Sequence, residues 1–286
     1  MSAPHIPGAG AGPKGAALRL LNILGRGVGH WAEEVDRRFG LMYVKTMPAD
    51  DRQAPEGCRS CVIRQSGICS ALTGEEVTRL SRIAHHRQYK AGQTILSCDD
   101  KPDFFAAVSS GVVKVSKLLL DGRQQIVGLL FPPDFLGRVF SRQIPYFAEA
   151  ATHVELCCFR HADFERMLKD HSEMSQHLLE HSLDKLDTAH DWMVLLGRKT
   201  AEERVASLLY LLVTRSKLAL AHDHGASRDT GFELHLKREE MADFLGLTYE
   251  TVIRQLKALY KKDIICLNGR REFSVPDLAA LAKAAG

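Results

Sequence analysis

Short runs of apolar residues, several of them alternating with polar ones, fill the chain between about residues 84 and 168. Turn-forming residues interrupt these runs, for example at Lys90-Ala-Gly, Asp121-Gly and Pro132-Pro-Asp. Many short strands separated by turns are typical of a small barrel or sandwich, so this part of the chain predicts a β-roll sensor domain. The expected strands cover residues 93–96, 104–108, 111–116, 126–131 and 153–159.

The stretch 234–259 has the positional pattern of a helix-turn-helix. Ala242 is small where two helices nearly touch, Gly246 stands where the turn needs a positive φ, and Val252 is apolar where the second helix packs on the first. Thr248 is a good N-cap for the second helix, which leaves the residues of its first turn pointing outward. Those outward residues are expected to meet DNA.

Between these two regions, apolar positions recur every three or four residues from about residue 162 to residue 196, which predicts one long helix. Leu179, Leu183, Leu186 and Met193 follow spacings of four, three and seven residues, as in a heptad seam. The partner of this seam is either the chain's own β-domain or a second copy of the chain. We favour a two-fold homodimer, because paired reading helices recognise paired half-sites.

After the helix-turn-helix the sequence predicts a hairpin wing. An apolar run at residues 264–267 and a strand at residues 272–275 flank the turn Asn268-Gly269. Arg270 and Arg271 follow the turn, where they are positioned for phosphate contacts.

The N-terminal residues give little information. Residues 1–15 are mostly Gly, Pro and Ala, and the spacing of apolar residues in 16–39 predicts one amphipathic helix. This helix is either a docking helix or lies upstream of a later translation start at Met42 or Met47.

These elements predict an α+β protein with a β-roll sensor domain, a long dimerisation helix and a C-terminal winged helix-turn-helix. We place a helix at residues 200–217 and a polar loop at residues 222–230 before the helix-turn-helix. The expected divisions are an N-terminal extension (1–57), a cysteine-rich loop (58–81), the β-roll (82–168), the dimerisation helix (169–197) and the winged helix-turn-helix (198–286).

Composition narrows the classes of protein. The chain is 45% hydrophobic and 26% charged, which is ordinary for a folded protein, and its net charge of +3 means that any surface for nucleic acid must be local. No apolar run approaches the roughly 20 residues of a membrane helix, and no signal peptide is apparent, so we expect a cytoplasmic protein without a membrane contact. The sequence contains no nucleophile motif, phosphate-cradling glycine loop or paired carboxylate signature, which argues against an enzyme.

Three cysteines within twelve residues, Cys58, Cys61 and Cys69, form the main chemical signal in the first half of the chain. Thiolates favour zinc or iron–sulfur clusters, and such close spacing lets one segment wrap a soft metal centre. A tetrahedral zinc site or a cubane cluster needs four protein ligands. The candidates for the fourth are Cys98, Cys157, Cys158 and Cys266, alongside nearby histidines.

The expected reading helix carries Glu250 and Arg254, which are four residues apart and so project from one face. Arginine can bind guanine O6 and N7 together, and glutamate can accept from cytosine N4. This pair is therefore predicted to read one or two G·C base pairs of double-stranded DNA. Other DNA-contacting candidates are Thr248, Ile253 and Lys257.

With the cysteine segment, β-roll, long helix and winged helix-turn-helix in this order, the chain resembles the Crp–Fnr superfamily of bacterial transcription regulators. The C-x2-C-x7-C spacing and the later pair Cys157-Cys158 resemble the oxygen-sensing Fnr type, in particular its FnrL or FnrN branch. The resemblance covers about residues 58–286. It includes the phrases Asp134-Phe-Leu-Gly-Arg and Glu239-Glu-Met-Ala-Asp-Phe-Leu-Gly-Leu-Thr.

The resemblance implies that Cys58, Cys61, Cys69 and Cys157 hold an oxygen-labile 4Fe-4S cluster, although a one-residue shift in the alignment would put Cys158 in place of Cys157. It also implies a homodimer that binds Fnr-box-like palindromes at low oxygen and acts with RNA polymerase. The alternative is a zinc-bound or cluster-free regulator of the same family that responds to another signal.

Two departures from the superfamily pattern qualify these expectations. Cyclic-nucleotide-binding relatives have a phosphate-binding Arg-Ser pair where this chain has residues 144–151, which contain no arginine and do contain Glu149, so we expect no cyclic nucleotide. Ile253 stands where the Fnr pattern has serine. Isoleucine cannot donate a hydrogen bond to a base but can contact a thymine methyl group, so the preference at one base of the TTGAT-type half-site is expected to change.

Overall fold

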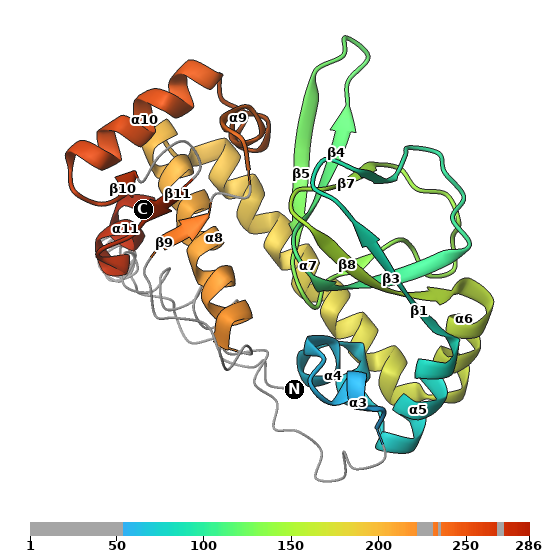
Figure 1. Ribbon diagram of the computed structural model, residues 1–286. Helices are drawn as coiled ribbons and strands as arrows, with labels where there is room; N and C mark the ends of the chain where they lie inside the picture. The colour runs from blue at the N-terminus through green and yellow to red at the C-terminus, as the bar shows by residue number, and fades with distance from the viewer. Residues whose placement is uncertain (1–53, 222–230, 234–235, 268–271) are drawn as a thin grey trace, which may run out of the picture.

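The computed structural model describes residues 54–221, 231–233, 236–267 and 272–286. The expected amphipathic helix at residues 16–39 and the arginines Arg270 and Arg271 lie outside this part of the chain. Figure 1 shows a β-roll on one side, a C-terminal domain of helices on the other, and the long helix α7 running between them. The predicted fold class, α+β with a sensor roll and a C-terminal helix-turn-helix, is confirmed.

The roll consists of two four-stranded sheets, in the orders β1-β8-β3-β6 and β2-β7-β4-β5. Apolar side chains from both sheets meet between them, among them Leu96, Val113, Ala148 and Leu156. The five strands expected from the alternating pattern all form, and β1, β6 and β7 complete the sheets. The strands are β1 (Ala84–Tyr89), β2 (Thr94–Leu96), β3 (Phe104–Ser110), β4 (Val113–Leu118), β5 (Gln124–Leu130), β6 (Phe135–Leu136), β7 (Phe147–Ala150) and β8 (Val154–Arg160).

The cysteine-rich segment is a series of short helices rather than the loop that we expected. The longest of these helices, α5, begins with a capping box in which the Thr73 hydroxyl accepts from the Glu76 N–H and the Glu76 carboxylate accepts from the Thr73 N–H. The segment packs on the outer face of the first sheet, beside α7 (Figure 1). Its elements are α3 (Glu56–Arg59), α4 (Val62–Ser66), η2 (Ile68–Ala71) and α5 (Gly74–Ile83).

The expected continuous helix from residue 162 to residue 196 is divided into α6 (His161–Asp170) and α7 (Ser172–Arg198). His171 interrupts it with φ −127° and ψ 94°, which is extended rather than helical backbone. The His171 ring is bound to Glu76, 2.8 Å away on α5, and this tertiary contact holds the break. The prediction of one helix was therefore wrong at this residue.

The C-terminal domain contains the expected helix-turn-helix and wing. Two of its elements were not expected from the sequence: a third strand, β9, which pairs with β11, and a final helix, α11, which packs on α8. No helix in the described residues is long and apolar enough to span a membrane. The elements are α8 (Ala201–Ala221), β9 (Gly231–Glu233), α9 (Arg238–Leu245), α10 (Tyr249–Lys261), β10 (Cys266–Leu267), β11 (Glu272–Ser274) and α11 (Leu278–Ala285).

Candidate cysteine centre and DNA-reading helix

The helix-turn-helix has the backbone that its sequence predicts. Gly246 ends α9 in the left-handed region at φ 60°, and Ala242 and Val252 are buried where the two helices meet. The Thr248 hydroxyl caps α10 by accepting from the Thr251 N–H at 3.3 Å. These local predictions are confirmed, and the side of α10 that carries Glu250 and Arg254 is exposed.

One exposed surface of α10 contains most of the predicted DNA-contacting residues. Glu250, Ile253, Arg254 and Lys257 line it together with Tyr249, Ala258 and Lys261. Arg254 donates to the Thr251 hydroxyl at 3.3 Å, which restrains the guanidinium on the outer side of the helix. Their roles in reading bases stay predictions.

The structure gathers four of the cysteines around one hydrophobic cluster. Cys69 belongs to this cluster, which also contains Ile63, Leu80 and Phe164, and the other three cysteines pack against it. In the described residues, no three His, Cys, Asp or Glu side chains lie close enough to hold a metal ion. The thiols therefore share a site without forming a closed coordination shell. The three packing cysteines are Cys58, Cys61 and Cys157.

The pleat of β8 separates Cys157 from Cys158. Cys157 lies opposite Ala107 of β3 and faces the cysteine segment, whereas Cys158 lies opposite Ala106 and is fully buried inside the roll. Successive residues of a strand point to opposite faces, so only one of the two can reach the cysteine segment. Cys98 is exposed after β2 and Cys266 lies in the wing, and neither packs on the hydrophobic cluster of the four other cysteines.

The environment of these thiols favours a protonated state when nothing is bound. Burial, followed by the neighbouring Cys157, Cys61 and Cys58, raises the pKa of Cys69 well above its usual value. Burial and the thiols of Cys61, Cys158 and Cys58 likewise raise the pKa of Cys157. Metal ligation requires thiolates, and a bound cation provides the charge that stabilises them here. The donor set therefore fits a soft metal centre that displaces the thiol protons.

Backbone and side-chain contacts hold the cysteine segment in place. Arg64 is buried and donates to the carbonyl oxygens of Cys69 and Leu72, which fixes the turn around Cys69. Ser70, the next residue, is hydrogen-bonded to His177 of α7 at 2.9 Å. The residue that follows the third cysteine of the segment is thus hydrogen-bonded to the long helix.

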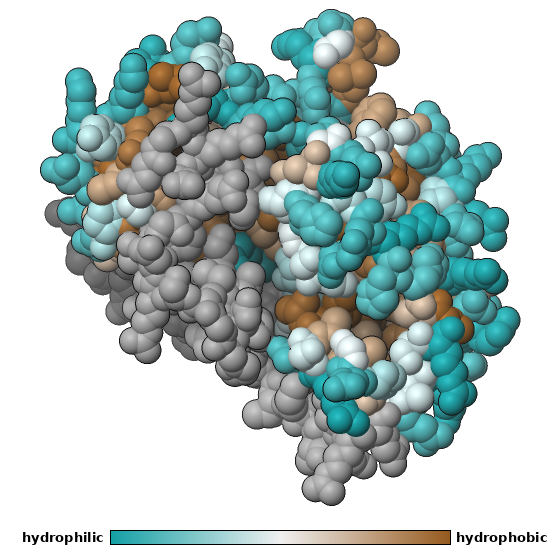
Figure 2. Space-filling view, in the orientation of Figure 1, coloured by the Kyte–Doolittle hydropathy of each residue, from teal (hydrophilic) through white to brown (hydrophobic). Residues whose placement is uncertain are grey.

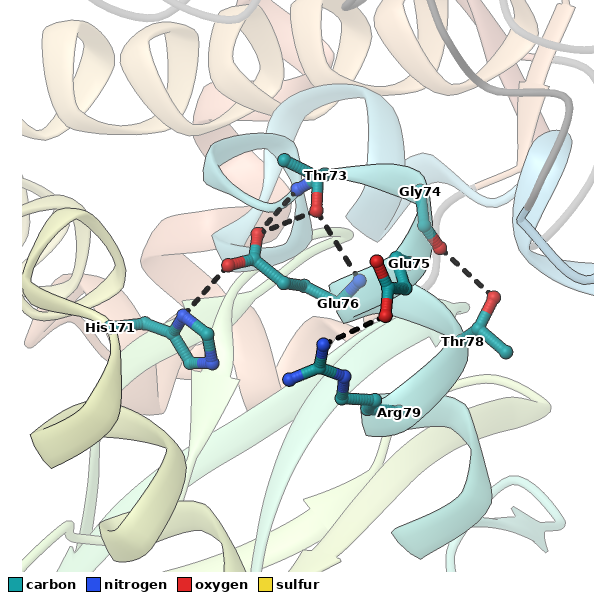
Figure 3. A network of polar contacts seen from close by, with 7 residues as sticks. All are labelled: Thr73, Gly74, Glu75, Glu76, Thr78, Arg79 and His171. Carbon is teal, nitrogen blue, oxygen red and sulfur yellow. Dashed lines mark hydrogen bonds and ion pairs between the residues drawn. The ribbon is translucent and has the colours of Figure 1, made fainter.

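A second contact joins the segment to the start of α7. The Glu76 carboxylate accepts from the N–H and the hydroxyl of Thr73 at 2.7 and 2.9 Å, and its other oxygen lies 2.8 Å from Nδ1 of His171 (Figure 3). The Thr73 N–H, helped by the Thr73 hydroxyl and His171, lowers the pKa of Glu76. Neither contact was predicted from the sequence. The only available signal was that His177 and His181 are four residues apart and so share one helix face.

The same face of α7 is bound to the roll by a buried carboxylate. Asp134 is inaccessible to solvent, and its side chain lies 2.6 Å from Lys185 Nζ and 3.6 Å from His181 Nε2. Burial alone would raise the pKa of Asp134, but Lys185, His181 and Arg215 more than offset burial and lower it. Lys185 and His181 therefore fix the inner face of α7 against the roll.

The opposite face of α7 is not covered by the residues that the structure describes. The predicted seam residues Leu179, Leu183, Leu186 and Met193 are 60%, 53%, 52% and 67% exposed. Met174 and Leu195, in contrast, are buried against the chain's own domains. The chain's own β-domain, the alternative partner for the seam, therefore does not cover it.

A roll, a long helix and a winged helix-turn-helix with an open reading face define a class of DNA-binding transcription regulators. The Crp-like helix-turn-helix domain matches residues 203–284, and the cyclic nucleotide-binding domain matches residues 86–171.

The relatives specify the family. The transcriptional activator protein FnrL of Cereibacter sphaeroides is 44% identical over 230 residues, covering 80% of this chain and 92% of that protein. A probable transcriptional activator of Rhizobium leguminosarum bv. viciae is 42% identical and covers 80% and 93%. The solved structure of FixK2 from Bradyrhizobium japonicum superposes with a TM-score of 0.62 at 28% identity, over 71% of this chain and 98% of that one. The chain belongs to the Crp–Fnr family and is a transcription regulator of the Fnr/FixK type, not an enzyme.

Proposed function

We propose that the chain senses oxygen through a 4Fe-4S cluster held by Cys58, Cys61, Cys69 and Cys157. The observation that carries the proposal is that Cys157, distant in the sequence, packs on the same hydrophobic cluster as the three cysteines of the N-terminal segment. Cys158, the neighbouring candidate, faces the interior of the roll instead. When bound, the cluster would supply an oxygen-labile centre that uses all four thiols as thiolates.

The chain's own residues would carry the state of this centre to α7. Ser70, directly after Cys69, contacts His177, and Glu76, seven residues after Cys69, contacts His171. A rearrangement of the segment would therefore change the start of α7 and its first turns. This is metal binding coupled to the equilibrium of an interface helix.

The exposed seam of α7 would then join two copies into a homodimer. Two such chains present two α10 helices, which suits a palindrome with two half-sites. We expect Glu250 and Arg254 to read a G·C pair of a TTGAT-type half-site, and Ile253 to change the preference beside it. Thr248, Lys257, Arg270 and Arg271 would contact the DNA backbone, and RNA polymerase would be the partner in activation.

Anaerobic purification tests the proposal. The protein should be brown, with iron and acid-labile sulfide in equal amounts, and should bind a palindromic duplex as a dimer. Air should remove the visible absorbance and weaken both dimerisation and binding. The duplex titration should be repeated with a scrambled half-site, so that loss of specific binding is separated from loss of general affinity.

Colour and metal content distinguish the alternative. A colourless protein that contains zinc would make the cysteines a structural site in a regulator with another signal. A protein that carries no iron when prepared without oxygen, yet dimerises and binds the operator fully, would contradict the proposed sensing while leaving the DNA-reading domain unaffected.

A further inference from the structure

A lysine on the sensor roll is buried between two carboxylates that come from different domains. Lys114, on β4, is 6% exposed. Its ammonium group lies 2.7 Å from Glu149 on the neighbouring strand β7 and also forms an ion pair with Glu240 of α9, the first helix of the helix-turn-helix. Glu149 is partly accessible, whereas Glu240 is nearly buried. The contact therefore joins the roll to the DNA-reading domain.

Glu240 also caps α9, so its contact with Lys114 fixes the N-terminal end of that helix on the roll. While one carboxylate oxygen binds Lys114, the other accepts from the Lys237 N–H at 2.7 Å and so caps the start of α9. Burial would lower the pKa of Lys114, but hydrogen bonds and charges from Glu149 and Glu240 more than offset burial and raise it. The lysine thus remains a cation, held at the N-terminal end of α9, where two carboxylates stabilise it.

Further contacts hold the rest of α9 on the same side of the roll. Gln125 of β5 donates to the Phe244 carbonyl oxygen at 3.1 Å, and the Trp192 ring of α7 meets the Phe244 ring edge-on with centroids 4.6 Å apart. One hydrophobic cluster continues from the roll residues Ile126 and Leu129 into the helix-turn-helix. Figure 1 shows α9 beside β4 and β5, with α10 on the side away from the roll.

In the triad of Glu149, Lys114 and Glu240, we infer that the interdomain pair of Lys114 and Glu240 positions the DNA-reading domain on the roll in the arrangement that binds the operator, whereas Glu149 pairs with Lys114 within the roll. The triad fixes α9 without covering α10, whose reading surface stays open. In a dimer organised by α7, the separation of two reading helices depends on how each domain is fixed to its own roll. Lys114 and Glu240 are therefore positioning residues for DNA reading. The inference rests on the DNA-binding part of the proposed function and not on the cluster.

Glu240→Gln and Glu149→Gln form a matched pair for the test. Each removes one carboxylate charge from Lys114 with almost no change in shape, but only Glu240→Gln weakens the link between the domains. A glutamine at 240 can still accept from the Lys237 N–H through its amide oxygen, so the cap of α9 is kept. Operator affinity should fall about fivefold or more in Glu240→Gln and stay within about twofold in Glu149→Gln. Lys114→Arg should restore most of the affinity that Lys114→Met loses.

Trp192 provides a readout of domain orientation. The chain has two tryptophans, so in a Trp31→Phe background the fluorescence comes from Trp192 alone. Glu240→Gln should increase quenching of Trp192 by acrylamide, because α9 moves away from it, whereas Glu149→Gln should not. Both variants are compared in the same metal-loaded state and at equal dimer content.

Equal operator affinities in the two glutamine variants would overturn the inference, as would tighter binding by Glu240→Gln, which would make the triad a restraint on the resting state. A failure of the proposed oxygen sensing is a separate result. It would appear as missing iron in the unmodified protein. The ratio of operator affinities between Glu240→Gln and Glu149→Gln would still test whether the contact between Lys114 and Glu240 supports DNA binding.

Discussion

The reading helix and the cysteine centre are built in opposite ways. Residues 238–261 form the reading site from one continuous stretch, in which Gly246 makes the turn and Thr248 caps the second helix. The cysteine centre takes three residues from the consecutive short helices α3, α4 and η2, with Cys61 as the N-cap of α4, and the fourth from β8, which only tertiary packing brings to them. Local geometry is therefore complete at the reading site before any ligand binds. At the cysteine centre the four thiols lie together without a closed coordination shell.

Because the two sites are built independently, a substitution in one should have little effect on the stability of the other. Substitutions on the reading helix should change DNA binding with the chromophore intact, whereas substitutions among the thiols should remove the chromophore and leave the helix-turn-helix folded. Lys114 and α7 connect the two halves, and effects that cross between them should pass through those contacts.

The largest effect should come from the paired cysteines of β8. Cys157→Ser should abolish the visible absorbance and the anaerobic binding of the operator, because one of the four proposed ligands is lost. Cys158→Ser should keep the absorbance and lower only the stability, since its side chain lies in the core of the roll. Both variants are prepared together without oxygen, and their cluster content is measured by iron analysis and by the visible spectrum.

An unchanged chromophore in Cys157→Ser would remove this ligand assignment, and loss of it in Cys158→Ser alone would assign Cys158 instead. Cys61→Ser serves as the positive control and should also lose the chromophore together with anaerobic regulation.

The next effect concerns the seam of α7. Leu183→Glu places a charge at the centre of an exposed apolar face, where it leaves the single chain folded but must be buried in a dimer. The dimer dissociation constant should rise about tenfold or more, measured by analytical ultracentrifugation without oxygen. Leu183→Met conserves volume and should behave like the unmodified protein. A full-strength dimer in Leu183→Glu would place the interface elsewhere.

Sequence patterns predicted what depends on neighbouring residues and missed what depends on distant ones. The turn at Gly246 and the cap at Thr248 follow from local backbone requirements. The break at His171 does not, because a contact with Glu76 on α5 holds it. The three-residue strand β9 is too short to give an alternating pattern, and it forms because β11 pairs with it.

The cysteine centre was predicted only in part for the same reason. The spacing of Cys58, Cys61 and Cys69 is visible in the sequence, but the choice between Cys157 and Cys158 depends on which face of β8 is turned outward. The pairing of Cys157 with Ala107 fixes that face, and no local pattern encodes it. The contacts of His171 and His177 were missed because their partners lie in the cysteine segment, far away in the sequence.

A smaller effect is expected from Arg254, the arginine proposed to read a base. Arg254→Ala should weaken specific binding by about 1 to 3 kcal/mol, mainly at the guanine of the half-site, because the bidentate contact is lost. Fluorescence anisotropy with single-base variants of the duplex measures this. Lys257→Ala should instead weaken all duplexes alike, as expected for a phosphate contact. Uniform losses with Arg254→Ala would make Arg254 a phosphate contact as well.

The smallest effect should come from the cap of the reading helix. Thr248→Ala removes the hydroxyl that accepts from the Thr251 N–H, and loss of an N-cap lowers the free energy of unfolding by about 1 kcal/mol. Thr248→Ser keeps that acceptor and should be close to neutral. Because α10 is capped locally, the visible spectrum should be unaffected in both variants. A change in the spectrum of Thr248→Ala would show that the reading helix and the cysteine centre are energetically coupled, although they share no residues.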